Sequence, residues 1–66
     1  MKNMYGLLAQ FSAKTPALTR KSLVRMFSEE LVDEALRKGY IVAFDKTDIG
    51  EVRYIITDAG REARDK

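Results

Sequence analysis

Residues 28–57 contain the signals for a helix that leads directly into a β-hairpin. Ser28 is a favourable N-cap, and the two glutamates that follow it suit the positive end of the helix dipole. The apolar residues of one helix face come next: Leu31, Val32, Ala35 and Leu36. Gly39 can adopt the left-handed conformation that ends a helix. The segment therefore predicts a helix over residues 29–38, followed immediately by a strand.

The hairpin is predicted from a polar turn, Thr47-Asp48-Ile49-Gly50, between two strands rich in β-branched and aromatic residues. With those four residues as the loop, Lys46 faces Glu51 and Phe44 faces Arg53. Side chains alternate between the two faces of a strand. One face then carries the predicted core residues: Ile41, Ala43, Tyr54 and Ile56.

The other face of the hairpin carries Val42, Phe44 and Ile55, which form a candidate interaction or dimer surface. Three large apolar side chains on an outer face are unusual for a small monomer. Another chain, a second copy or the chain's own ends could cover them.

The segment before residue 28 predicts two more helices and a short extended piece. The first helix spans residues 2–12, with an apolar face of Met4, Leu7, Leu8 and Phe11. Ala17 and Leu18 form the extended piece, and Leu18 points into the core. Thr19 caps the second helix, which ends at Phe27; Thr15 with Pro16 is the alternative start. Its buried face is expected to hold Leu23, Val24 and Phe27, whereas Arg20, Lys21 and Arg25 are expected to project outward.

Together these elements predict one α+β domain over residues 1–66, mostly helical: a three-helix core, a two-stranded hairpin and a short C-terminal helical turn. Thr57 is expected to cap that last turn.

Charge is divided unevenly along the chain, although the formal net charge is only +2. Residues 1–27 contain five basic residues and no acidic one, whereas residues 28–66 contain ten acidic and seven basic residues. The division predicts a basic patch on one side of the molecule.

Composition excludes several classes of site. The chain has no cysteine and no histidine, so it lacks thiolate metal ligands, disulfides and the usual general base near pH 7. The four glycines are scattered and form no phosphate-binding loop. We therefore expect no catalytic residues, metal, cofactor or small-molecule substrate. The N-terminus has no signal-peptide pattern and no segment is apolar enough for a membrane span, which favours a cytoplasmic protein.

The predicted order of elements, helix, extended piece, helix, helix and two-stranded wing, resembles that of winged helix-turn-helix domains. The segment LVDEALRKGYI resembles the third helix and strand entry of MarR-type regulators, and RYIITDAGREA is similar to their returning wing strand and following helix start.

This resemblance implies duplex DNA binding, with the third helix in the major groove and the wing along the adjacent minor groove. The implied phosphate contacts on the second helix are Thr19, Arg20, Lys21, Ser22 and Arg25. Further contacts are implied for Arg37 and Lys38 at the end of the third helix, and for Lys46 and Arg53 on the wing. A small DNA-binding transcriptional regulator acting as a homodimer is therefore the leading functional hypothesis.

The exposed positions of the third helix are acidic: Glu29, Glu30, Asp33 and Glu34. These carboxylates could form a solvated helix face, bind a basic protein or the basic residues of a second copy, or read bases directly. The alternative hypothesis is therefore a winged-helix module that binds protein through the acidic third helix or the apolar outer wing face.

Overall fold

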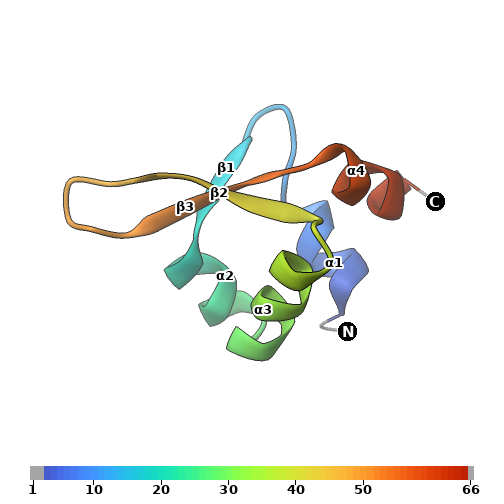
Figure 1. Cartoon of the computed structure of the whole chain (residues 1–66), viewed down its shortest axis with the longest axis horizontal. Helices are drawn as coiled ribbons and strands as arrows, with labels where there is room; N and C mark the ends of the chain where they lie inside the picture. The colour runs from blue at the N-terminus through green and yellow to red at the C-terminus, as the bar shows by residue number, and fades with distance from the viewer. Residues whose placement is uncertain (1–2, 66) are drawn as a thin grey trace.

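The computed structural model describes residues 3–65, which form four helices and a three-stranded antiparallel sheet (Figure 1). The elements in chain order are α1 (Met4–Ala9), β1 (Ala17–Thr19), α2 (Arg20–Met26), α3 (Glu29–Arg37), β2 (Ile41–Lys46), β3 (Val52–Ile56) and α4 (Asp58–Asp65). The chain therefore has an α+β fold.

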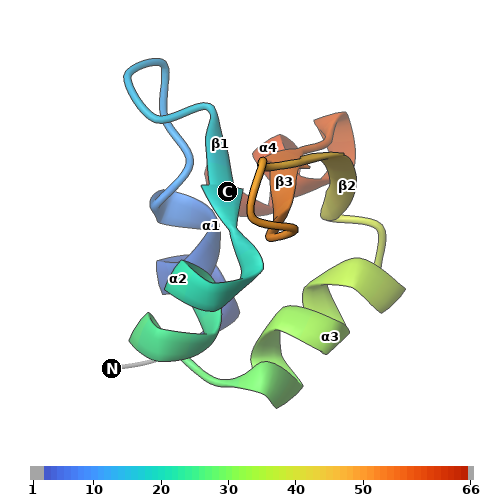
Figure 2. The ribbon, with the colours of Figure 1, turned by 90° about the vertical axis from the view of Figure 1, so that its left-hand side faces the viewer.

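The predicted ends of α2 and α3 are confirmed by their capping groups. The Thr19 hydroxyl oxygen accepts a hydrogen bond from the Ser22 N–H at 3.2 Å, so the alternative start at Thr15 is wrong. The Ser28 hydroxyl oxygen accepts from the Leu31 N–H at 3.1 Å. Gly39 has φ +76°, the left-handed conformation expected where α3 ends. Figure 2 shows α2 and α3 meeting at a short corner below the strands.

The sheet has three strands, so the prediction of only two strands is wrong. β3 lies in the centre, with β2 on one side and β1 on the other. The predicted extended piece at residues 17–18 extends to Thr19, and Leu18 pairs with Tyr54 of β3. Local sequence predicted the extended conformation but not its partner, which lies 36 residues further along the chain.

The predicted hairpin register is correct near the helices and wrong near the turn. Ile41 pairs with Ile56 and Val42 with Ile55, as expected, but Asp45 rather than Phe44 pairs with Arg53. Lys46 consequently pairs with Val52 rather than Glu51. Phe44 is the extra residue of a β-bulge.

The turn explains the shift in register. The Thr47 N–H donates to the Glu51 carbonyl at 2.8 Å, and the Gly50 N–H donates to the Thr47 carbonyl at 2.9 Å. These bonds leave a three-residue loop with Gly50 at φ +83°. The register beside the turn therefore moves by one residue, and the bulge restores it before the buried positions.

The core lies between the sheet and the helices α1, α2 and α3, which all lie on one side of it (Figures 1 and 2). Its buried side chains are Leu7, Leu8, Phe11, Leu23, Val32, Ala35, Ile41 and Tyr54. Val24, Phe27 and Ile56 are half-buried against this cluster, whereas Ala43 is exposed despite its predicted inner position.

The first and last helices differ from prediction in length. α1 is shorter than residues 2–12 at both ends. The Asn3 side chain caps its start by accepting from the Gly6 N–H at 2.8 Å, and the helix ends at Ala9 with Gln10 as its C-cap; residue 2 lies outside the described residues. α4 is an eight-residue helix rather than a single turn. It begins after Thr57, whose hydroxyl oxygen accepts from the Gly60 N–H at 3.1 Å, as predicted for a cap. Arg64 of α4 donates to the Phe11 carbonyl at 2.9 Å, which links α4 to the segment after α1.

None of the helices within residues 3–65 combines the length and apolar character that crossing a membrane requires.

Candidate functional site

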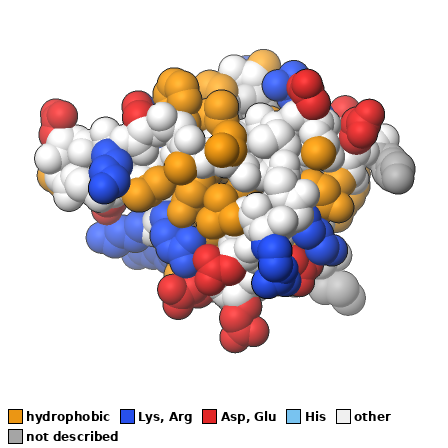
Figure 3. Space-filling view, in the orientation of Figure 1, with side chains coloured by type: hydrophobic (Ala, Val, Ile, Leu, Met, Phe, Trp, Pro, Cys, Tyr) orange, Lys and Arg blue, Asp and Glu red, His pale blue; other side chains and the backbone are white. Residues whose placement is uncertain are grey.

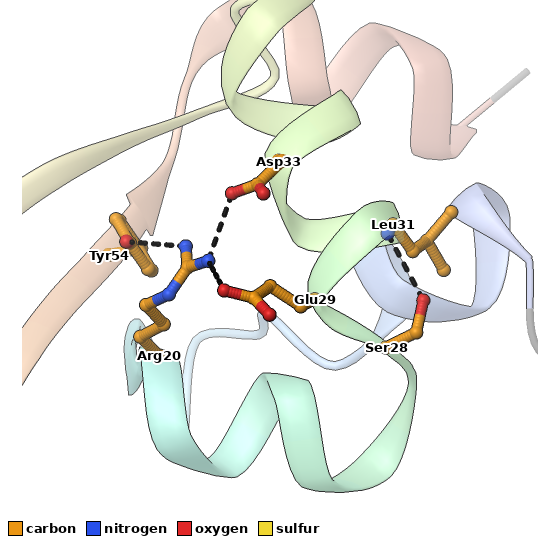
Figure 4. A network of polar contacts seen from close by, with 6 residues as sticks. All are labelled: Arg20, Ser28, Glu29, Leu31, Asp33 and Tyr54. Atoms are coloured by element: carbon orange, nitrogen blue, oxygen red, sulfur yellow. Dashed lines mark hydrogen bonds and ion pairs between the residues drawn. The ribbon is translucent and has the colours of Figure 1, made fainter.

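Arg20 connects α2, α3 and the sheet through one guanidinium group (Figure 4). Its Nη1 donates to the Tyr54 hydroxyl at 3.3 Å. Its Nη2 donates to Glu29 at 3.3 Å and to Asp33 at 3.0 Å. Glu29 and Asp33 are one turn apart on α3, so a single cation pairs with both carboxylates.

The position of Arg20 follows from the chain just before it. Thr19 is both the last residue of β1 and the N-cap of α2, so the chain turns from sheet to helix at this residue. Arg20 is the first helical residue, and only 30% of its side chain is exposed. The prediction that Arg20 projects outward is therefore wrong, because the acidic side of α3 and the inward-facing Tyr54 attract it.

These contacts change the electrostatics of α3. The hydrogen bonds to the Tyr54 hydroxyl and to Asp33 raise the pKa of Arg20 above its ordinary value, with a further contribution from Glu29. The guanidinium therefore stays charged beside the two acids. Arg20 thus pairs with two of the four predicted acidic positions of α3.

Three other predicted DNA contacts also form ion pairs within the chain. Lys21 lies 3.8 Å from Glu51, and Lys38 lies 3.5 Å from Glu34. The Arg53 Nε donates to Asp45 at 2.6 Å, and its Nη2 contacts the second carboxylate oxygen. Exposed pairs of this kind contribute little to stability and exchange readily with solvent or another anion.

The remaining predicted cations, Arg25, Arg37 and Lys46, are exposed and form no ion pair with another residue in the range 3–65. The Thr19 and Ser22 hydroxyl groups are bonded to each other at 2.9 Å. Both therefore help to form the start of α2.

The structure brings some of these residues together at a groove between α2 and the hairpin. The groove has a volume of about 410 Å³ and is lined by Arg20, Lys21, Val24, Glu29, Gly50, Glu51 and Val52. Figure 3 shows Lys and Arg side chains gathered below the hairpin, next to acidic side chains lower on the same face.

Arg37, Lys38 and Arg53 lie elsewhere. Arg37 and Lys38 are at the C-terminal end of α3, the opposite end from Glu29. Arg53 follows the opposite alternation from the buried Tyr54, so it belongs to the outer face of the sheet. The nine predicted DNA contacts therefore do not form a single surface.

The outer face of the sheet is apolar and accessible, as expected. Val42 is 46% exposed and Phe44 is 59% exposed, whereas Ile55 is half-buried. The Arg53 guanidinium lies over the Phe44 ring, 6.0 Å from its centroid. The Arg53 guanidinium also lowers the pKa of Asp45 by hydrogen bonding to its carboxylate. Arg53 and Asp45 on this face therefore neutralise each other.

Two further features were not recognised from the sequence. Ile49, at the tip of the hairpin, is 80% exposed. A cavity of about 420 Å³, here called the loop–α4 hollow, lies at the other end of the sheet and is lined by Phe11, Ser12, Ala13, Pro16, Ile55, Ile56, Arg61 and Arg64. A lone apolar residue in the turn was a signal for the first feature. The second has no local signal, because three distant segments form it.

Comparison with protein-family models, with curated proteins and with solved structures finds no match for this chain.

Proposed function

We propose that this chain is a winged helix-turn-helix domain that binds duplex DNA, with α2, α3 and the β2–β3 hairpin facing the DNA. The observation that carries the proposal is the arrangement around Arg20. A tight α2–α3 corner stands beside a projecting hairpin, and the charge of Glu29 and Asp33 on α3 is partly compensated by Arg20.

The order of elements supports this assignment. A short strand precedes two helices that meet at a steep corner, and an antiparallel hairpin follows the second of them. In winged-helix domains the second of these helices enters the major groove and the hairpin follows the neighbouring groove. The hairpin projects beyond the helices in Figure 1, so both elements could contact one duplex.

Arg20 reduces the main electrostatic obstacle. Carboxylates on a helix that approaches DNA would repel the phosphates, and each would oppose binding. Glu29 and Asp33 both accept from Arg20, so their charge is partly compensated before DNA arrives. In this proposal Arg20 is a positioning residue for α3 and not a phosphate contact.

Phosphate binding in this proposal comes from Lys21 and Arg25 on α2 and from Lys46 on the hairpin. All three side chains are exposed. Lys21 would exchange Glu51, 3.8 Å away, for a phosphate group. Cations of this kind add affinity on any sequence and make binding sensitive to salt.

A salt-dependent titration with duplex DNA tests the proposal. Binding should weaken steeply as salt increases, and each phosphate contact should contribute about −0.9 to the slope of log K against log salt. Lys21→Ala should weaken binding to every sequence and reduce the magnitude of that slope by about 1. Arg25→Ala should have a similar effect.

Lys14→Ala is the matched control, because it removes the same charge from the exposed loop between α1 and β1. Its salt slope should equal that of the unmodified chain. Absence of binding at low salt would refute the proposal, and so would equal losses from Lys21→Ala and Lys14→Ala.

A further inference from the structure

The hairpin ends in an apolar side chain that is held away from the rest of the molecule. Ile49 is 80% exposed. The turn around it is closed by the two backbone bonds of Thr47 and by its hydroxyl oxygen, which accepts from the Glu51 N–H at 3.1 Å. Because these bonds fix the turn, binding of Ile49 to another surface would cost little backbone entropy.

The loop–α4 hollow offers an apolar site of suitable chemistry. Phe11 and Pro16 line it from one side, and Ile55 and Ile56 line it from β3. It lies where the α1–β1 loop approaches α4, at the end of β3 away from the turn. The tip and the hollow are thus at opposite ends of β3 and cannot meet within one molecule (Figure 1).

We propose that two copies of this chain form a reciprocal dimer, in which Ile49 of each copy enters the loop–α4 hollow of the other. The projecting group and its receiving hollow are both present on one chain, which is what a self-complementary two-fold interface requires. This inference concerns self-association and does not rest on the proposed DNA binding; both would use the hairpin, so the dimer is tested without DNA.

Charges beside the two contact points are complementary. Asp48 is exposed next to Ile49 and forms no ion pair with any other residue of the described range 3–65. Arg61 lines the hollow, and its contact with Asp58 is long, at 3.8 Å. Insertion of Ile49 would bring Asp48 of one copy towards Arg61 of the other, an attraction that sets the orientation of the pair.

The outer sheet face supplies the rest of the contact area. A stable interface buries about 800 Å² on each partner, more than one side chain can provide. Val42 and Phe44 lie on the hairpin between the tip and the hollow and are already exposed. The only charges paired across β2 and β3 in the described sheet are Asp45 and Arg53, which neutralise each other. Two such faces can therefore approach without net repulsion.

Sedimentation velocity over a range of concentrations, without DNA, tests the dimer. The unmodified chain should pass from monomer to dimer as concentration rises. Ile49→Ser should raise the dissociation constant on the order of a hundredfold, because both symmetric contacts lose a buried apolar side chain. Since Ile49 is exposed in the single chain, the variant should fold normally by circular dichroism.

Met26→Ser is the matched control, because Met26 is another exposed apolar residue and lies on α2, on the helix side of the sheet. It should leave the dissociation constant unchanged. A chain that remains monomeric at every concentration would overturn the proposal. Equal dissociation constants for Ile49→Ser and the unmodified chain would also overturn it.

A mixing experiment tests whether the contact is reciprocal. Ile49→Asp removes the tip, and Ala13→Trp fills the hollow, so each variant alone should be monomeric. A one-to-one mixture retains one intact tip and one intact hollow, and should form a heterodimer more readily than either variant alone. A mixture no better than its components would refute the insertion. Growth into larger assemblies would refute the closed two-fold arrangement.

Discussion

The two halves of the β2–β3 hairpin are stabilised in different ways. The half nearest the helices, residues 41–43 with 54–56, keeps the predicted register and buries Ile41 and Tyr54. The distal half, residues 44–53, has a shifted register, an exposed Phe44 and a bidentate contact between Arg53 and Asp45. The first half is held by buried side chains far away in the sequence. The second is held mainly by neighbours within the hairpin, although Val52 packs against the core and Arg53 pairs with Thr19 of β1.

This difference shows how a small chain can form a hairpin that projects beyond its hydrophobic core. Hydrophobic burial fixes the face of each strand only where there is a core to cover. Closest to the turn, the turn hydrogen bonds and the Asp45–Arg53 ion pair contribute most to the pairing. The distal half is therefore free to carry exposed groups without large effects on folding.

Truncation on the two faces of the near half should give the largest contrast. Ile41→Ala should reduce the free energy of unfolding by about 3 kcal/mol, because a fully buried side chain leaves a cavity. Val42→Ala, one residue further along β2, should cost less than about 0.5 kcal/mol in the monomer. Urea unfolding at low concentration measures both. Similar losses from the two variants would mean that the outer face is also buried in the monomer.

An added methyl group at Gly60 should disturb the base of the hairpin. A Cβ atom there would lie 2.2 Å from the Tyr40 carbonyl oxygen and 2.7 Å from the Ile56 Cγ1. Backbone must shift to relieve this, so Gly60→Ala should cost about 2 kcal/mol in urea unfolding. Ala59→Ser, at the exposed neighbouring position, is the control and should have little effect. A neutral Gly60→Ala would show that α4 is loosely held against the hairpin.

A change in pH should alter the stability contributed by the distal half, and this should be the smallest of the three effects. Arg53 lowers the pKa of Asp45 below its ordinary value of 3.8, so the pair stabilises the folded state above that pH. This contribution is lost as pH falls through the lowered pKa. An NMR titration should place the Asp45 midpoint below 3.8, and Arg53→Gln should return it towards 3.8. An unchanged midpoint in the variant would assign the shift to another group.

Features set by neighbouring residues could be predicted from the sequence. Thr19, Ser28 and Gly39 act within one helical turn of their own positions, and each was assigned correctly. The inner positions Ile41 and Tyr54 were also identified, because the bulge at Phe44 restores the predicted register before these positions.

Features that join distant segments could not be predicted in the same way. The partner of Arg20 on the sheet, Tyr54, is 34 residues away, and no spacing rule connects the two. The bulge at Phe44 depends on which carbonyl closes the turn, and the four-residue loop assumed from the sequence differs from the observed one by a single residue. The loop–α4 hollow forms only where three segments distant in sequence pack together, so no local sequence pattern indicates it.

The bulge at Phe44 has a consequence for what can attach to the free side of β2. β2 is an outer strand of the sheet, and such strands can recruit an extended chain, which leads to aggregation. The extra residue breaks the even spacing of backbone donors and acceptors along that side, so an incoming strand would meet an interrupted hydrogen-bonding ladder. The chain can therefore expose Val42 and Phe44 for association through its face while resisting the growth of fibres through its edge.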